Sequence, residues 1–125
     1  MAGIDESRPF IALNIVVLTV SDSRTQQDDI SGSTLVERLE QAGHTLHSKR
    51  IVPDDQATIE SVLQACIGDS GVDVVLATGG TGLTGRDVTP EAFASVYEKE
   101  IPGFGELFRA LSYDLIGTST IQSRA

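Results

Sequence analysis

Hydrophobic and polar positions fall in blocks along this chain, and three of the blocks predict β-strands. Residues 10–20 (FIALNIVVLTV) are almost continuously apolar and rich in β-branched side chains, which is typical of a strand buried on both faces of a sheet. Residues 45–52 are interrupted by polar side chains and fit an edge strand, whereas residues 72–78 (VDVVLAT) are mainly apolar again. We therefore expect three strands, with the first one central.

Between and after these strands, the apolar positions follow a helical period. Three segments, 34–42, 59–67 and 104–115, place their apolar side chains on one face of a helix. Gly43 supplies a stop signal for the first of them. Thr89 followed by Pro90, a capping residue and then proline, predicts the start of a further helix. Alternating strands and helices predict an α/β fold, with a parallel sheet covered by helices on both faces.

Polar segments follow each predicted strand and are expected to meet. They comprise residues 21–32, 53–55 and 79–89. Ligands of parallel sheets bind at the carboxyl ends of the strands, so we expect these three loops to form one binding rim. Residues 1–9 carry no structural signal, and we expect a loose N-terminal arm followed by a single domain over residues 10–125.

Composition and charge narrow the possible partners. Nine Lys and Arg stand against eighteen Asp and Glu, a net charge of −9 over 125 residues. Such a surface repels nucleic-acid phosphates and anionic membranes, so we expect neither as a partner. The single cysteine, Cys66, lies on an apolar helical stripe, and with only one cysteine no intramolecular disulfide can form. One cysteine and two histidines are also too few ligands for a structural zinc site. Without a signal-peptide pattern or an apolar run of the ~18 residues that a membrane span needs, we expect a cytoplasmic protein.

Residues 77–92 (ATGGTGLTGRDVTPEA) combine a strand end, glycines and a helix start, as phosphate-binding loops do. Residues 80–85 match the dinucleotide pattern G-x-G-x-x-G, but the helix begins only at Thr89, and the acids about 20 positions on lie in helical sequence. A Walker loop is excluded, because Arg86 and Asp87 stand where Lys and Ser or Thr are required. A flexible turn without a ligand would not need Arg86, Asp87 and a helix start in succession. We therefore predict a phosphate cradle.

Two aspartates accompany this cradle. Asp87 lies just before the predicted helix, where it either caps the helix or holds a Mg²⁺ that bridges phosphate oxygens. Asp54 reaches the same rim with the same two alternatives. Two carboxylates beside a phosphate loop suit metal-assisted phosphoryl or nucleotidyl transfer, in which the protein mainly positions groups and neutralises charge.

Six segments point to a known family. They are TVSDSR (19–24), DISG (29–32), IVPDD (51–55), TGGTGLTGRDVTPEA (78–92), PGFGELFR (102–109) and IGTSTIQSRA (116–125). In order and spacing they resemble the MoaB/MogA family of molybdenum cofactor biosynthesis proteins and the related G domains of gephyrin. The AGH that ends the first predicted helix (42–44) and the final GTSTIQSRA (117–125) are most similar to the MoaB branch. The resemblance implies a three-layer αβα sandwich with a mostly parallel central sheet that binds molybdopterin. In active members it implies adenylylation of molybdopterin by Mg-ATP with release of pyrophosphate, a nucleotidyltransferase reaction.

The resemblance also implies roles for individual residues. Asp54 and Asp87 match the two functional aspartates and would hold Mg²⁺, and both are retained here, which favours activity. The other candidate substrate-binding or phosphate-binding residues are Ser21 and Asp22 on the nucleotide side, Gly79, Gly80, Thr81 and Gly82 of the cradle, Arg86 and Thr89 after it, and Ser123 and Arg124 near the pterin. Pairing of Arg86 with phosphate is left open by the sequence. For Glu106 two alternatives remain: it reaches the pocket, or it lies on a solvated helix face.

Two alternatives to an adenylyltransferase remain on the same fold. One is a non-catalytic molybdopterin-binding or carrier protein, and the other is the molybdate-insertion enzyme, which usually belongs to a larger multidomain chain. The resemblance further implies a homo-oligomer, a trimer or hexamer, and contacts with other cofactor biosynthesis proteins. Family members continue beyond the position of Ala125 with a strand and a Pro-Gly-rich loop, so we expect that part of the pterin pocket to lie outside these 125 residues.

Overall fold

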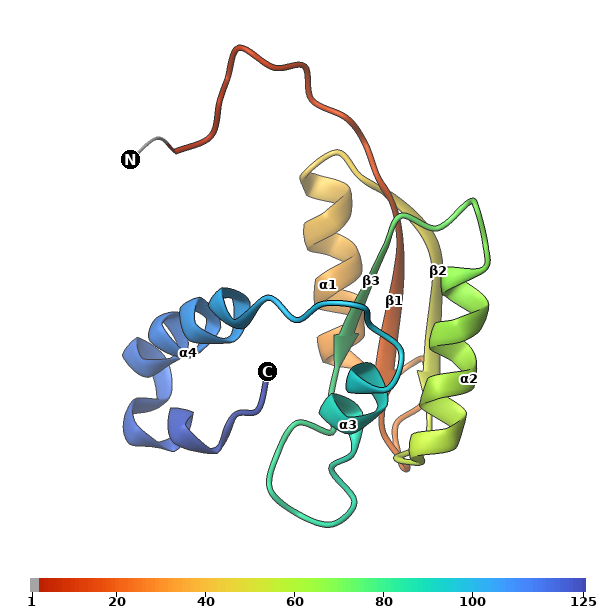
Figure 1. Cartoon of the computed structure of the whole chain (residues 1–125), viewed down its shortest axis with the longest axis vertical. Coiled ribbons are helices and arrows are strands. Elements are labelled where there is room, and N and C mark those ends of the chain that lie inside the picture. Colours follow the sequence, from red (N-terminus) through yellow and green to blue (C-terminus); the bar gives the residue numbers. More distant parts are fainter. Residues whose placement is uncertain (1–2) are drawn as a thin grey trace.

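Three parallel strands form the sheet at the centre of the protein (Figure 1). The computed structural model describes residues 3–125, and its strands are β1 (Asn14–Val20), β2 (Thr45–Val52) and β3 (Val74–Thr78). Their order is β2-β1-β3, and β1 pairs in parallel with both neighbours. The predicted central position of the first strand and the edge position of the second are confirmed.

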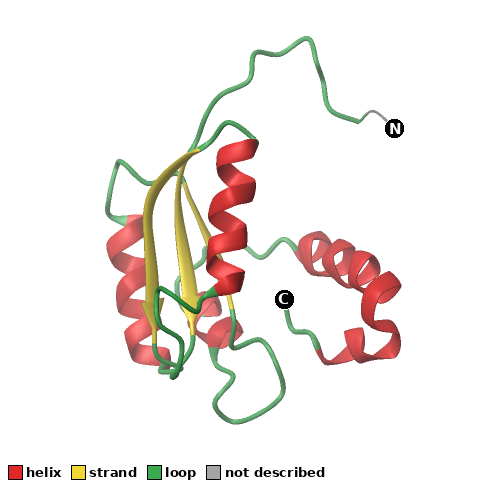
Figure 2. Ribbon diagram, turned by 180° about the vertical axis from the view of Figure 1, so that it is seen from behind, coloured by secondary structure: helices red, strands yellow, loops and turns green. Residues whose placement is uncertain are grey.

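Helices cover both faces of this sheet (Figure 2). Their bounds are Ile30–Gln41 for α1, Gln56–Ile67 for α2, Thr89–Ala94 for α3 and Pro102–Ile116 for α4, followed by a 3-10 helix, η1, over Gly117–Gln122. The helix α1 packs against one face of the sheet, while α2 and α3 pack together on the other. The predicted three-layer αβα architecture is confirmed.

Burial on both sides explains why β1 has no alternation of apolar and polar residues. All six residues from Ile15 to Val20 are buried, and four of them contribute to two separate core clusters. Buried residues on the α1 side are Ile15, Val17 and Leu39, and those on the α2 and α3 side are Leu18, Val20, Val52, Ile59, Leu63 and Ala92. Cys66 is buried on α2, as expected from its place on the apolar stripe.

Several predicted element boundaries were wrong. The first strand begins at Asn14 rather than at Phe10, whose exposed ring packs against His44 with 5.1 Å between the ring centroids. Strand β3 begins at Val74 rather than at 72. The helix α1 begins at Ile30, inside the segment 21–32 that was expected to be a loop, because a buried aspartate caps it there.

That aspartate, Asp29, joins three elements of the fold. Its carboxylate accepts hydrogen bonds from the Thr19 hydroxyl at 2.6 Å and from the Gly32 amide at 3.0 Å, and Lys49 Nζ of β2 lies 3.6 Å away. Burial by itself raises the pKa of Asp29, but the hydrogen bonds from Thr19 and Gly32 and the charge of Lys49 outweigh it and lower that pKa below its ordinary value. The ionised side chain therefore fixes the start of α1 against the ends of β1 and β2.

We expect Asp29→Ala to lower the free energy of unfolding by about 3 kcal/mol, because it removes a helix cap and charge-assisted hydrogen bonds. Urea denaturation at neutral pH measures the change, and Glu40→Ala on the exposed side of the same helix serves as the matched control. The stabilisation is present above the unfolded-state pKa of ~3.9 and is lost as pH falls through the lower folded-state pKa. Equal stability of the two variants would contradict this role.

The apolar side of α4 is exposed, although its periodicity is that of a buried helix face. Phe104 and Leu111 are 66% and 64% exposed, and Gly105 is the buried residue of this helix. The helix packs mainly against η1 and stands away from the sheet (Figure 1). Further exposed apolar side chains on this segment are Ile101, Leu107, Phe108, Leu115, Ile116 and Ile121. Within residues 3–125, no helix is long and apolar enough to cross a membrane.

Candidate functional site

The loops that follow the three strands meet at one rim, as predicted. The carboxylate of Asp22, in the loop after β1, accepts a hydrogen bond from the backbone N–H of Asp54, after β2, at 2.9 Å. Its other oxygen pairs with Arg86 of the glycine loop that follows β3. One aspartate thus joins all three loops at the carboxyl ends of the strands.

The start of the glycine loop requires glycine for two physical reasons. Gly79 and Gly80 have φ angles of 96° and 69°, a region that side chains rarely adopt. A Cβ on Gly79 would also lie 2.2 Å from the carbonyl oxygen of Val20, and one on Gly80 would lie 2.3 Å from Thr89 Oγ1. The backbone of this loop therefore lies directly against β1 and α3.

Thr89 supports this loop and does not cap the helix. It is the first residue of α3, Val88 occupies the capping position, and no side chain caps this helix end. The Thr89 hydroxyl donates to the carbonyl oxygen of Gly79 at 2.7 Å, and its N–H donates to the carbonyl of Gly80 at 3.1 Å. The predicted cap at Thr89 was wrong, and the hydroxyl of this buried residue instead donates within the protein.

Asp87 does not cap α3 either. Its Oδ2 atom accepts hydrogen bonds from the backbone N–H of Thr84 at 2.9 Å and from the Thr84 hydroxyl at 2.8 Å. The pKa of Asp87 is lowered by the hydrogen bond from the Thr84 side chain, then by that from the Thr84 backbone, with a further contribution from the charge of Arg124. Asp87 is therefore ionised, and of its two oxygens these bonds engage only Oδ2.

Asp54 does not cap the helix α2, although its position in the sequence allowed that role. The neighbouring Asp55 caps α2, accepting a hydrogen bond from the N–H of Thr58 at 3.0 Å. A Cβ added to Gly80 would lie 3.3 Å from Asp54 Oδ1, and one added to Gly82 would lie 2.7 Å from Asp87 Oδ2. The two carboxylates therefore border the same short stretch of glycine-rich backbone.

This donor set fits Mg²⁺ bound together with a substrate. Within residues 3–125 no group of three His, Cys, Asp or Glu side chains could form a complete metal cage. Mg²⁺ usually needs no such cage, because it is held by one or two carboxylates, several waters and substrate phosphates. Asp54 and Asp87 supply hard oxygen ligands of this kind.

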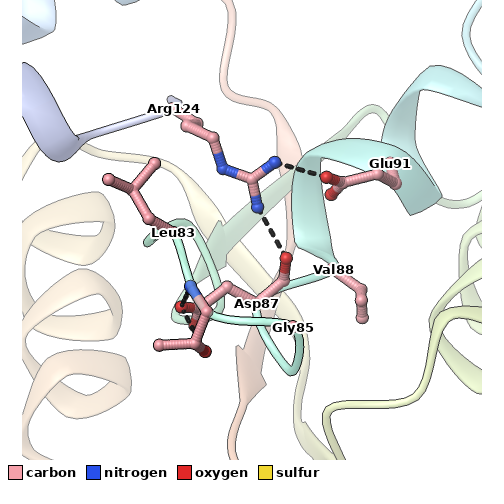
Figure 3. A pocket seen from close by; sticks show the side chains of 7 residues that line it. Leu83, Gly85, Asp87, Val88, Glu91 and Arg124 are labelled. Carbon is pink, nitrogen blue, oxygen red and sulfur yellow. Dashed lines mark hydrogen bonds and ion pairs between the residues drawn. The ribbon is translucent and has the colours of Figure 1, made fainter.

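Two of the cavities in residues 3–125 flank the glycine loop. The smaller, of about 240 Å³, is formed around Asp87 and Arg124 (Figure 3), and its lining is Leu83, Thr84, Gly85, Asp87, Val88, Glu91 and Arg124. The larger, of about 430 Å³, is an apolar groove between α1, the end of β3 and α4. Gly79 and Thr81 line this groove, whereas Asp54, Ser21 and Asp22 line neither cavity.

The remaining candidates differ in how closely they approach this site. The Ser21 hydroxyl accepts hydrogen bonds from the N–H groups of Ser23 and Arg24 and so shapes the first loop. The carbonyl oxygen of Ser123 accepts a hydrogen bond from Arg109 at 3.4 Å, and Ser123 lines neither cavity. Glu106 is exposed on α4, also outside both cavities, which agrees with a solvated helix face.

Two polar residues of the smaller cavity, Thr84 and Glu91, were not singled out in the sequence. Thr84 holds the carboxylate of Asp87, and Glu91 pairs with Arg124. Both lie in the motif TGGTGLTGRDVTPEA, at three residues before and four residues after Asp87. Aspartate side chains can hydrogen-bond to the backbone three residues earlier, and this local pattern could have identified Thr84.

Comparisons with known proteins agree with the motifs and the fold. Residues 16–125 match the family described as "Probable molybdopterin binding domain". Molybdenum cofactor biosynthesis protein B of Escherichia coli (strain K12) is 47% identical over 119 residues, which cover 95% of this chain and 70% of that protein. A protein of Pyrococcus furiosus named molybdopterin adenylyltransferase is 43% identical over 111 residues, which cover 87% of this chain and 64% of that protein.

Solved structures give the same relationship. A crystal structure of molybdenum cofactor biosynthesis protein B matches with a TM-score of 0.89 at 46% identity, covering 94% of this chain and 74% of that one. The tungsten cofactor synthesizing protein MoaB from Pyrococcus furiosus matches with a TM-score of 0.80 at 39% identity, covering 90% of this chain and 70% of that one. The chain therefore belongs to the molybdopterin-binding domain family, together with the molybdenum cofactor biosynthesis proteins B.

Proposed function

We propose that this protein is a molybdopterin adenylyltransferase, which transfers AMP from Mg-ATP to molybdopterin and releases pyrophosphate. The proposal rests on the position of two carboxylates, those of Asp54 and Asp87. Neither caps a helix, and both lie beside the glycine backbone at the carboxyl ends of the strands. The name of the Pyrococcus furiosus relative supports the same reaction. The use of ATP makes the cytoplasm the expected place for it.

The proposed reaction needs no protein nucleophile. An oxygen of the terminal phosphate of molybdopterin attacks the α-phosphorus of ATP and forms a new P–O bond. The bond from the α-phosphorus to the oxygen that bridges to the β-phosphorus breaks, and its electron pair leaves with pyrophosphate. A phosphate monoester is already an anion at neutral pH, so no general base is required.

The protein contributes positioning and charge. Asp54 and Asp87 would hold Mg²⁺, which when bound neutralises charge on the leaving pyrophosphate. Backbone N–H groups of residues 79–82 would contact phosphate oxygens, and the close packing of Gly79 against Val20 keeps that backbone rigid. Arg86, which is exposed and paired with Asp22, would add a cation at the same rim.

A second candidate function is that of a carrier, which binds molybdopterin without catalysing a reaction of it. The two are separated by measuring pyrophosphate in mixtures that lack ATP, Mg²⁺ or molybdopterin in turn. An adenylyltransferase forms pyrophosphate only when all three are present. Binding of molybdopterin without pyrophosphate, under conditions in which an active relative reacts, would favour the carrier and exclude the enzyme.

We also propose that the protein is a homo-oligomer, a trimer or hexamer, with the apolar face of α4 in an interface. Phe104, Leu107 and Leu111 of this helix are each more than 60% exposed, and exposed apolar side chains that lie together mark protein interaction sites. Their burial would contribute roughly 25 cal/mol per Å² of apolar surface removed from water.

The assembly can be tested on one turn of α4. We expect light scattering to give a multiple of the 13.3 kDa chain mass for the wild type and a lower mass for Leu111→Asp, because a charge would be placed in the apolar face. Asp114→Asn, on the same helix, is the matched control and should keep the wild-type mass. A monomeric wild type would exclude the assembly.

A further inference from the structure

The segment 123–125 contacts the glycine loop through one residue, Arg124, by both its backbone and its side chain. Its backbone N–H donates to the carbonyl oxygen of Thr81 at 3.1 Å, which places the residue beside the loop. Its guanidinium then crosses the loop, as Figure 3 shows for the contacts with Asp87 and Glu91. The side chain is 31% exposed and so lies partly under the surface.

Each nitrogen of this guanidinium has a protein partner. Nε donates to the carbonyl oxygen of Gly82 at 2.6 Å, and Nη2 donates to the carbonyl oxygen of Asp87 at 2.6 Å. Nη1 pairs with the carboxylate of Glu91 on α3. The planar fork of arginine can reach three acceptors in fixed directions in this way, whereas a lysine ammonium cannot reproduce the geometry.

The two carbonyl groups lie at the two ends of the segment 82–87. Binding both of them to one rigid guanidinium fixes the span of that segment. Inside it, Thr84 binds the carboxylate of Asp87, so the orientation of that carboxylate depends on the shape of the same segment. Glu91 holds the guanidinium from α3 and completes the connection between tail, loop and helix.

We propose that Arg124 is a positioning residue, which clamps the segment 82–87 and thereby sets the place of Asp87, rather than a residue that binds the phosphate or the pterin. The inference rests on the proposed function, because Asp87 is taken as a ligand of the Mg-nucleotide. It assigns to Arg124 a role that requires no contact with substrate. It also distinguishes Arg124 from Arg86, whose side chain is mostly exposed at the rim.

The test uses Arg124→Ala and Arg124→Lys, with Arg50→Ala on the exposed side of β2 as the control. We expect Arg124→Ala to lower kcat by about tenfold to 100-fold while the KM values for ATP and molybdopterin change little, because the reacting groups are misplaced rather than unbound. Arg124→Lys should recover only part of this loss. A large rise in either KM with an unchanged kcat would show direct substrate binding and overturn the proposal.

Amide hydrogen exchange tests the clamp without any activity. In the ligand-free protein, we expect exchange across residues 82–88 to rise by about tenfold in Arg124→Ala and to stay at the wild-type rate in Arg50→Ala. Unchanged exchange in Arg124→Ala would overturn the clamp. Should the wild type form no adenylylated product, the proposed function fails while the exchange result still decides whether the clamp exists.

A second variant guards against loss of the fold. Glu91→Ala removes the carboxylate that orients the guanidinium but leaves both carbonyl contacts possible. We expect a smaller rise in exchange and a smaller fall in kcat, in the same direction as for Arg124→Ala. If Arg124→Ala does not fold, Glu91→Ala decides: wild-type exchange and kcat in this variant would overturn the proposal.

Discussion

Asp87→Asn is expected to reduce adenylyl transfer by about 100-fold or more while molybdopterin binding stays measurable. Asparagine has nearly the same shape, and its carbonyl oxygen can still accept the hydrogen bonds from Thr84, so the loop should keep its form. What the substitution removes is the negative charge that would hold Mg²⁺ on the phosphates. The rate is measured as pyrophosphate release at saturating ATP, and pterin binding by equilibrium titration.

Asp55→Asn is the matched control for this experiment. Asp55 lies on the same rim but caps α2, and asparagine caps a helix as well as aspartate does. We expect this variant to keep wild-type activity and stability. If Asp87→Asn retained at least half of the activity, a role for the Asp87 carboxylate in the reaction would be contradicted.

Gly79→Ala is expected to lower the free energy of unfolding by about 3 kcal/mol or more. The new methyl group would lie 2.2 Å from the carbonyl oxygen of Val20, and the residue has a φ of 96°, so both steric overlap and backbone strain contribute. Because Val20 belongs to the central strand, the overlap cannot be relieved by moving a flexible side chain. Urea denaturation of the two proteins measures the difference.

Gly85→Ala provides the comparison within the same loop. A Cβ added to Gly85 would have no other atom within 4 Å, and the φ angle of Gly85 is not positive. We expect this variant to be as stable as the wild type, within the roughly 0.5 kcal/mol that is usual for surface changes. Equal effects of the two alanines would mean that the close approach of Gly79 to β1 does not constrain the loop.

The hydrophobic pattern was sufficient to predict the layers and the meeting of the three loops. Residues 45–52 were predicted as an edge strand and form β2 with the same bounds, because a strand between a glycine turn and Pro53 has clear limits in the sequence. The convergence of three loops followed from the rule that parallel strands end on the same side. The contacts of Asp22 with Asp54 and Arg86 confirm it.

Long-range side-chain contacts decided what the sequence left open. Asp54 and Asp55 are equal candidates for a helix cap in sequence, and only the turn of the backbone assigns the cap to Asp55. The helix α1 begins at Ile30 because Asp29 finds Thr19 and Lys49 in neighbouring strands. A local pattern carries no information on such partners.

The same limit explains Thr89 and Arg124. Thr89 has the local pattern of a helix cap, but Gly79 lies close enough to take its hydroxyl instead. Arg124 lies in a polar tail, far in sequence from the loop that it clamps. The apolar pattern of α4 predicted a helix correctly but not what would cover it, since periodicity does not specify a partner.

The most direct test of the proposed function is to measure which phosphorus atom of ATP is transferred to molybdopterin. The protein is incubated with molybdopterin, Mg²⁺ and ATP labelled at the α-phosphorus or, separately, at the γ-phosphorus. We predict that α-label appears in the pterin product, that γ-label appears only in pyrophosphate, and that a chelator abolishes both. Bound molybdopterin that acquires no α-label, beside an active relative that does, would contradict adenylyl transfer by this protein.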